Sequence, residues 1–248
     1  MPTSLFVPDF QAVLEQARRS AGRDRGAFPS PADWRDLPIY FLMLDRFNNP
    51  SAPPIHAPFD DPAYSDYQGG KFSRVRDQLA YIKQLGVGAI WLSPVLRNLR
   101  FDLSYHGYGI HDFLRAEPRF ADDPDAADDE LRALVDAAHD HGLYVVMDIV
   151  LNHAGDVFAY QCDPWDAACT GSSGGVASYH DQPQPISWRD QDGVAYPGFA
   201  VIEEISSPSR DAFVWPSELQ QNRFFRRHGL MGGARATTRS ATSASSSR

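Results

Sequence analysis

A helix, a glycine and an apolar strand follow one another twice in this chain, and this order constrains its fold more than any other feature. In the second copy, apolar residues recur at helical spacing before Gly142, and the run 143–151 is apolar and rich in β-branched residues. The first copy occupies residues 72–95, with one helix predicted up to Gly86 and a strand that stops at Pro94. This alternation predicts parallel βα units with buried strands.

A further buried strand is expected earlier in the chain, because residues 39–49 (IYFLMLDRFNN) have the length and composition of a strand and end in polar residues. Residues 8–20 carry an amphipathic stripe that predicts a short helix, and a linker rich in Gly and Pro follows it. The expected regions are 1–34 as N-terminal helix and linker, 35–153 as the βα part, 154–231 as an irregular inserted segment, and 232–248 as a tail.

The tail, GGARATTRSATSASSSR, has no apolar residue larger than Ala and no acid. Such a composition cannot bury enough surface to fold. Two interpretations stay open, a natural disordered tail or a change of reading frame near Met231, and we expect the second because another βα unit is due at this point. The chain would then be a truncated product.

Composition excludes several classes of protein. The chain of 248 residues is 43% hydrophobic, which fits a domain with a real core, and its net charge of −9 argues against binding nucleic acid or an anionic membrane. No apolar run approaches the ~20 residues of a membrane helix, and the first residues lack the features of a signal peptide, so we expect a cytoplasmic protein. Cys162 and Cys169 are expected to be free loop thiols, with a short disulfide as the alternative.

Polar residues follow the expected strands, and in parallel sheets ligands bind outside the carboxyl ends of the strands. Asp45 and Asp148 are two such carboxylates. Paired carboxylates are what glycosidic hydrolysis requires, so one interpretation makes them the catalytic pair. The other, which we favour, is that each accepts hydrogen bonds from backbone groups or an Arg and supports the site from behind.

The loop between the two repeated units is dense in aromatic rings. His106 and Tyr108 lie on either side of Gly107, with Gly109 next, and these glycines would let the backbone approach a ligand closely. Tyrosine combines a flat apolar face with a polar tip, which suits stacking on a sugar ring, although such a loop also packs on its own domain. His153 could donate to a hydroxyl and Asn152 could offer an oxygen to calcium, with purely structural roles as the alternative.

Four blocks together resemble the N-terminal part of the catalytic domain of the α-amylase superfamily, glycoside hydrolase family 13. They are 39–49 (IYFLMLDRFNN), 79–95 (LAYIKQLGVGAIWLSPV), 105–113 (YHGYGIHDF) and 144–153 (YVVMDIVLNH), and the resemblance covers about residues 35–230. It implies an α/β fold made of the first three βα units of a (β/α)8 TIM barrel, with the inserted domain B of that family as the irregular segment.

The resemblance also implies roles at matching positions. Tyr108 would stack on the sugar at the cleavage subsite, with His106 beside it, and His153 would hydrogen-bond the hydroxyls of that sugar. Asp148 would be a supporting carboxylate. Asn152 matches a position that ligates calcium in many members, so calcium is the one implied cofactor. A second calcium position of some members falls on Asp45 and its neighbours, but the loop NNPSAPP departs from that pattern.

The departure from the family concerns the reaction itself. The nucleophilic Asp, the acid/base Glu and the third active-site Asp of the family come from strands after domain B, and no GFRxD-like block occurs in this chain. We therefore expect no catalytic residue here, and an α-glucan hydrolase or transglycosylase that is inactive as this chain alone. Its expected partner is an α-glucan or maltooligosaccharide. The alternative is a non-catalytic carbohydrate-binding or interaction protein, and the sequence gives no oligomeric state.

Overall fold

The computed structural model describes residue 6 and residues 8–20, 28–50, 67–101, 104–160, 178–180, 186–189, 214–221, 224–225 and 229–231. The chain divides into two compact units: the first is Met1–Arg97, Leu103–Tyr108 and Leu114–Ile149, and the second is Asn98–Asp102, Gly109–Phe113 and Val150–Arg248. Cys162, Cys169 and the tail from residue 232 lie outside the described residues, so the predictions made for them are not tested.

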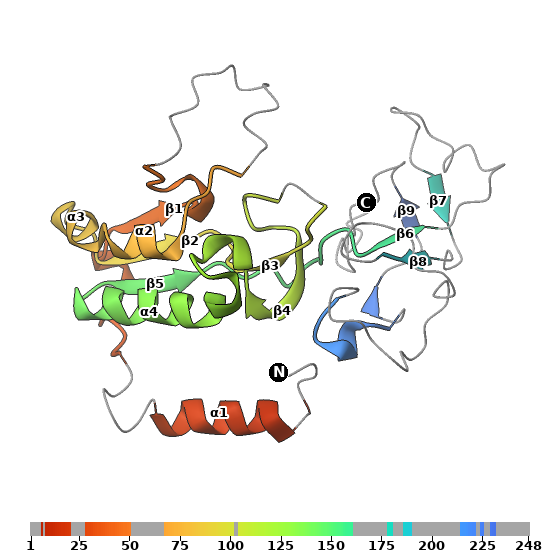
Figure 1. Cartoon of the computed structure of the whole chain (residues 1–248), viewed down its shortest axis with the longest axis horizontal. Helices are drawn as coiled ribbons and strands as arrows, with labels where there is room; N and C mark the ends of the chain where they lie inside the picture. The colour runs from red at the N-terminus through yellow and green to blue at the C-terminus, as the bar shows by residue number, and fades with distance from the viewer. Residues whose placement is uncertain are drawn as a thin grey trace, which may run out of the picture. The chain divides into compact units, whose positions relative to one another are not determined.

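A parallel sheet forms the centre of the first unit (Figure 1). Its strands are β1 (Ile39–Leu42), β2 (Ala89–Leu92) and β5 (Tyr144–Met147), in the order β1-β2-β5. They pair in parallel and end together, with Leu42 opposite Leu92 and Leu92 opposite Met147. The predicted parallel α/β arrangement is therefore confirmed, and the polar residues after all three strands emerge at one edge of the sheet.

Three helices cover one face of this sheet: α2 (Phe72–Arg76), α3 (Leu79–Gln84) and α4 (Ala127–Asp140). Their apolar side chains form a core with the strand residues that point the same way. The buried members that these elements contribute are Leu42, Ile90 and Leu92 from the strands and Phe72, Val75, Leu79, Ile82, Leu134 and Ala138 from the helices. The helical spacing in the sequence also placed Leu85 and Val135 on the apolar faces, and neither belongs to this core.

The single helix expected before Gly86 is two helices, so that prediction was wrong in detail. The amide of Gln78 donates to the carbonyl of Val75 at 3.0 Å, a tighter turn than an α-helix, and the next helix starts immediately after it. This turn changes the direction of the helical face, which leaves Leu85 49% exposed. The two predicted glycine stops are confirmed, because Gly86 and Gly142 have φ values of 82° and 65°.

β5 is shorter than the apolar run that predicted it. The last ladder bond runs from the amide of Asp148 to the carbonyl of Leu92 at 3.2 Å, and β2 ends at Leu92. Without a partner strand beyond that point, the chain leaves the sheet, and Ile149 and Leu151 are 57% and 83% exposed. The expectation of one buried strand over residues 143–151 is corrected to Tyr144–Met147.

The opposite face of the sheet is partly open. Ile39 and Phe41 on β1 are each 47% exposed and Trp91 on β2 is 40% exposed, while Phe41 and Trp91 meet edge to face with ring centroids 5.3 Å apart. The expectation of buried strands therefore does not hold for these side chains. An apolar run in the sequence indicates a strand, but the burial of its side chains depends on what packs against each face of the sheet.

The N-terminal residues supply one helix and one packed segment. α1 (Pro8–Ser20) has the predicted bounds. Further along, Phe28 stacks on His139 of α4 with ring centroids 4.2 Å apart, and the hydroxyl of Tyr144 donates to the carbonyl of Pro29 at 2.6 Å. The end of the predicted linker thus packs against the amino end of β5, away from the polar strand ends.

The sequence did not predict the pair β3 (Leu96–Asn98) and β4 (Ile110–Ala116), which flank the aromatic loop. In the second unit, β6 (Phe158–Tyr160) pairs antiparallel with β8 (Ile186–Trp188), and β7 (Ser178–His180) with β9 (Gly229–Met231). The second unit has its own small core of buried residues, Leu99, Ala154, Val157, Phe158, Trp188 and Val214.

Short 3₁₀ helices complete the described elements. They span Trp34–Asp36, Leu44–Arg46, Pro118–Phe120, Pro124–Ala126 and Ser217–Leu219. Within the ranges given above, no helix is both long enough and apolar enough to cross a bilayer.

Candidate functional site

Each strand of the parallel sheet is followed by a polar residue at its carboxyl end. Asp45 follows β1, Ser93 follows β2 and Asp148 follows β5. The amide of Ser93 donates to the carbonyl of Leu42 at 3.0 Å, so this residue continues the ladder past the end of β1. In parallel sheets ligands bind at the carboxyl ends of the strands, and here a polar residue follows each of the three strands at that edge.

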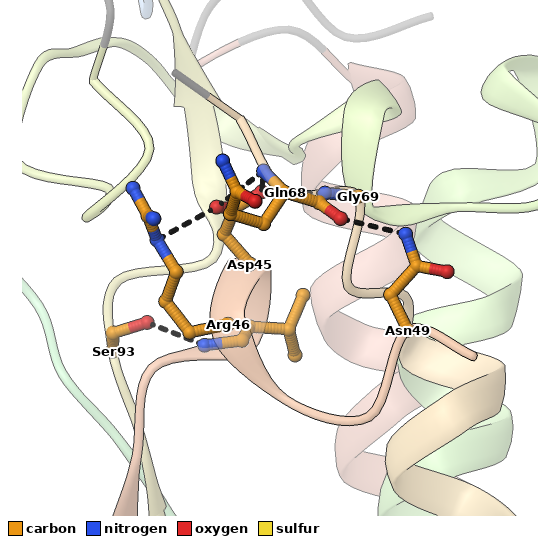
Figure 2. Close-up of polar contacts among 7 residues, drawn as sticks. Asp45, Arg46, Asn49, Gln68, Gly69 and Ser93 are labelled. Atoms are coloured by element: carbon orange, nitrogen blue, oxygen red, sulfur yellow. Dashed lines mark hydrogen bonds and ion pairs between the residues drawn. The ribbon is translucent and has the colours of Figure 1, made fainter. Parts of the chain in front are cut away.

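Asp45 is buried, and backbone amides surround its carboxylate (Figure 2). The amide of Gln68 lies 3.0 Å and 2.8 Å from its two oxygens, and the amide of Gly69 donates to Oδ1 at 3.1 Å. Nε of Arg46 lies 3.1 Å from Oδ2, an ion pair that is not aligned as a hydrogen bond. Both carboxylate oxygens of Asp45 therefore interact with groups of the protein.

Burial raises the pKa of the Asp45 carboxyl above its usual range. The amides of Gln68 and Gly69 and the positive charges of Arg46 and Arg119 act in the opposite direction and stabilise the ionised form. Because the side chain is 0% exposed, it cannot reach a substrate as nucleophile or proton donor. Of the two interpretations of this carboxylate, the structure favours support of the site and excludes a place in a catalytic pair.

Asp45 and its neighbours fix a segment of the chain that we call the strap, residues 67–70. The amide of Gly70 donates to the Asp45 carbonyl at 2.8 Å, and Nδ2 of Asn49 donates to the carbonyl of Gln68 at 2.6 Å (Figure 2). A Cβ on Gly70 would lie 1.9 Å from the carbonyl oxygen of Leu44, so only glycine permits this approach. The strap thus packs directly against the backbone of Leu44 and Asp45, just after the end of β1.

Tyr108 and Asp148 meet at the end of β5. The Tyr108 hydroxyl donates to Oδ2 of Asp148 at 3.0 Å, and the Tyr108 amide donates to Nδ1 of His106 at 3.0 Å, which leaves the proton of the neutral imidazole on Nε2. Desolvation raises the pKa of Tyr108, and the hydrogen bond to Asp148 and its charge raise it further. Tyr108 is still 38% exposed, so a ligand can reach its ring.

Gly107 lies between these two rings, and another segment of the chain packs closely against it. Its φ is 88°, and a Cβ there would lie 2.0 Å from the carbonyl oxygen of Pro94. The space where that Cβ would lie is filled by the segment that follows β2, and the approach of a ligand to this loop stays a prediction. Gly107 permits the aromatic loop to lie directly on that segment.

Asn152 and His153 belong to the second unit, so the structure does not relate them to Tyr108. Asn152 is exposed and His153 is half-buried, and both have interactions of their own. Among the described residues, no group of three or more His, Cys, Asp or Glu side chains could hold a metal ion. Calcium in proteins also takes amide and backbone carbonyl oxygens as ligands, so the expectation that Asn152 binds calcium stays a prediction.

Of the predicted site residues, the structure brings together Tyr108, His106 and Asp148. Sequence reasoning missed Arg46, whose guanidinium lies over the ring of Tyr105 at 3.9 Å from its centroid. It also missed Ser93, whose Oγ accepts from the amide of Leu44 at 3.1 Å. The only signal for Arg46 was its position directly after Asp45, since no spacing pattern connects it with a ring in a later loop.

The arrangement described so far defines a class of protein: an α/β unit with an aromatic and acidic site at the carboxyl ends of parallel strands. The family model "Alpha amylase, catalytic domain" matches residues 41–193. The chain therefore belongs to the alpha-amylase catalytic-domain family, whose members include glycoside hydrolases.

Curated relatives agree with this assignment. Alpha-amylase mde5 of Schizosaccharomyces pombe is 36% identical over 126 residues, which is 49% of this chain and 23% of the relative. Neopullulanase 2 of Thermoactinomyces vulgaris is 33% identical over 137 residues, or 53% of this chain and 22% of the relative. The chain spans less than a quarter of the length of these two relatives.

A solved structure is also similar to part of the chain. It is an alpha-amylase of Geobacillus thermoleovorans in complex with acarbose, with 38% sequence identity, a TM-score of 0.41, and coverage of 50% of this chain and 25% of the other.

Proposed function

We propose that the edge of the sheet around Tyr108 and Asp148 binds an α-glucan or maltooligosaccharide, as part of a retaining glycoside hydrolase or transglycosylase. The observation that supports this most is the 3.0 Å hydrogen bond from the Tyr108 hydroxyl to Asp148, which holds an accessible ring at the end of β5. A fixed, partly exposed tyrosine ring suits stacking on a pyranose, whose axial hydrogens present an apolar face.

The polar groups around the ring suit the rim of the same sugar. Asp148 is half-buried and offers its carboxylate oxygens as acceptors for hydroxyl groups, while the Nε2 hydrogen of His106 is a donor. His153 adds a second imidazole to the proposal through the family resemblance. The ligand class expected from these groups is neutral, which also agrees with a chain of net charge −9.

The finer architecture is part of the same proposal. We take β1, β2 and β5 with their helices as the first three βα units of a (β/α)8 barrel, and the chain after His153 as domain B. Two features support this: the parallel order β1-β2-β5, and the short antiparallel pairs with a separate core in the second unit. Calcium enters the proposal only as an ion that the side-chain oxygen of Asn152 would bind, and no step of the proposed function depends on it.

Retaining hydrolysis needs a carboxylate nucleophile and a carboxylic acid about 5 Å apart. Asp45 is buried and Asp148 accepts a hydrogen bond from Tyr108, so neither is available as the nucleophile. The family resemblance assigns both the nucleophile and the acid to later strands. We therefore propose that these 248 residues alone bind a glucan but do not cleave it. Release of reducing sugar from starch by the chain, purified from a host without amylase, would contradict this part.

The binding part is tested with maltoheptaose and the 248-residue chain, by isothermal titration calorimetry. We expect Tyr108→Ala to weaken binding about tenfold or more, because stacked aromatic contacts dominate such small interfaces. The matched control is Tyr81→Ala, which removes a tyrosine that is 53% exposed and lies on α3, not in a segment that follows a strand. Equal loss in both variants, or no binding by the unaltered chain, would contradict the proposal.

The alternative is a non-catalytic carbohydrate-binding or interaction protein that uses the same face. Exposure of the Tyr108 ring is compatible with it, because a ring can stack on a glucan without any reaction. Sequencing the gene beyond the codon for residue 248 and translating it in all three reading frames distinguishes the hydrolase from the binding protein. A continuation that carries an Asp and a Glu on further βα units supports the hydrolase, and its absence in every frame supports the binding protein.

A further inference from the structure

The aromatic loop, residues 104–108, lies across the carboxyl edge of the sheet and contacts the segment after each strand. Tyr105 lies under Arg46, which follows β1, and Gly107 packs on Pro94, which follows β2. Tyr108 reaches Asp148, which follows β5. The strand order is β1-β2-β5, so these three loop residues, taken in chain order, contact the segments after the strands in the order of the sheet.

The contact at β5 is a hydrogen bond and the contact at β2 is a close backbone approach, whereas the contact at β1 depends on one cation. The guanidinium carbon of Arg46 lies 3.9 Å from the centroid of the Tyr105 ring, inside the range of a cation–π interaction. Only 24% of the Arg46 side chain is exposed, so this interaction is partly shielded from water. It is therefore stronger than a similar pair on an open surface.

Asp45 holds that guanidinium in place. Its Oδ2 lies 3.1 Å from Nε of Arg46, and Asp45 is itself fixed by the amides of Gln68 and Gly69 (Figure 2). A planar guanidinium can face a carboxylate along its edge and cover an aromatic ring with its flat side, which a lysine ammonium cannot do. A buried carboxylate, an arginine and a tyrosine therefore form one connected series.

We propose that Arg46 is a positioning residue for glucan binding: held by Asp45, it fixes Tyr105 and so sets the place of His106 and Tyr108 over the strand ends. The ring centroid of His106 lies 5.2 Å from that of Tyr105 and 5.4 Å from that of Tyr108, so His106 connects the two tyrosine rings along the loop. Arg46 touches no sugar in this proposal. It acts through Tyr105, and the inference rests on the proposed function of Tyr108.

The test uses the 248-residue chain labelled with ¹³Cζ-tyrosine, with two readouts. The first is the Tyr108 resonance, assigned with Tyr108→Phe, because its chemical shift reports the hydrogen bond to Asp148 without any ligand. The second is the dissociation constant for maltoheptaose. We expect Arg46→Met to move the Tyr108 resonance toward that of an exposed tyrosine and to weaken binding about fivefold.

Two variants on the ring side separate positioning from general stability. Tyr105→Phe keeps the ring under Arg46 and should leave both readouts unchanged, whereas Tyr105→Leu should reproduce Arg46→Met, and the two changes together should add little more. The control is Arg74→Met on α2, where Arg74 has an exposed contact of 3.9 Å with Asp77. It should change neither readout.

The outcomes distinguish this inference from the proposed function. If the unaltered chain does not bind maltoheptaose, the proposed function fails, and the Tyr108 resonance alone decides whether Arg46 positions the loop. If Arg46→Met and Tyr105→Leu both leave that resonance at its original shift, Arg46 has no positioning role. If Arg46→Met fails to fold, the comparison of Tyr105→Phe with Tyr105→Leu decides in the same way.

Discussion

Two carboxylates follow parallel strands at the same edge of the sheet, and their surroundings are opposite. Asp45 after β1 is 0% exposed and accepts from backbone amides, while Asp148 after β5 is half-buried and accepts from the hydroxyl of Tyr108. The difference follows from what crosses each strand end. The strap of residues 67–70 donates its backbone amides to Asp45, whereas the group that bonds to Asp148 among the described residues is the side-chain hydroxyl of Tyr108.

This comparison shows how one position in a repeated pattern takes two different roles. A carboxylate whose oxygens are filled by fixed amides holds the backbone together and cannot exchange its partners for a ligand. One that bonds to a partly exposed tyrosine can share its remaining lone pairs with a ligand. The β1 end of the sheet is therefore structural and the β5 end is the better candidate for binding.

The largest expected effect distinguishes the two carboxylates by stability. Asp45→Ala leaves buried amides and a partly buried arginine without their acceptor, so we expect a loss of about 3 kcal/mol in the free energy of unfolding. Asp148→Ala should cost about 1 kcal/mol or less, because water can reach the groups that it leaves. Urea unfolding followed by circular dichroism measures both. Equal losses at the two positions would remove the distinction between them.

The next largest effect concerns the contact of Gly107 with Pro94, which places the loop that contains Tyr108. Gly107→Ala should destabilise the chain by about 2 kcal/mol or displace the loop, because its Cβ would meet the carbonyl oxygen of Pro94. Gly86→Ala is the matched control, with a similar φ but no atom within 4 Å of the added Cβ, and should cost about 1 kcal/mol. The difference between the two thermal unfolding curves isolates the contact. A larger cost at Gly86 would contradict this account.

A smaller effect is expected on the titration of Tyr108. Asp148→Asn removes a negative charge beside the hydroxyl, so the pKa of Tyr108 should fall toward its ordinary value, with desolvation still keeping it raised. Because the folded pKa is raised, the stability from this group is present below the unfolded pKa near 10 and is lost as the pH rises through the folded pKa. A ¹³Cζ NMR titration measures the change. An unchanged pKa would mean that Asp148 does not hold Tyr108.

The smallest effect is the pH dependence that arises from Asp45. Burial raises its folded pKa above the unfolded value of about 3.9, so the folded state binds a proton more readily than the unfolded state. The contribution of Asp45 to stability should therefore be fully present below about pH 3.9 and decrease as the pH rises through the folded pKa. Unfolding of the unaltered chain and of Asp45→Asn, compared at several pH values, tests this. The opposite slope would show that the surrounding amides and arginines outweigh burial.

Part of the fold was predictable because it depends on local chemistry. Gly86 and Gly142 end helices because of their own backbone freedom, and Pro94 marks the end of β2 because it cannot join a ladder. Apolar spacing on α4 identified Leu134 and Ala138 as core residues. These features are properties of single residues and their near neighbours, so the sequence carries them directly.

Other features depended on contacts between distant segments. The break between α2 and α3, the early end of β5 and the open side of Phe41 and Trp91 all follow from packing that periodicity does not report. At the site, the residues Tyr108, His106 and Asp148 were named from the sequence, but not the hydrogen bond that joins two of them. The close approach of Gly107 to Pro94 was also not predicted, because no local pattern connects these two segments.

The sequence by itself determined the alternation of helix and strand, the polar strand ends and the family resemblance, because these depend on residue type and spacing along the chain. Only the tertiary structure decided which groups meet. Asp45 accepts from the amides of the strap, Asp148 accepts from the hydroxyl of Tyr108, and Arg46 lies over the ring of Tyr105. The physical reason is burial and distance. Whether a carboxylate or a ring is fixed, shielded or accessible depends on which remote segment packs over it.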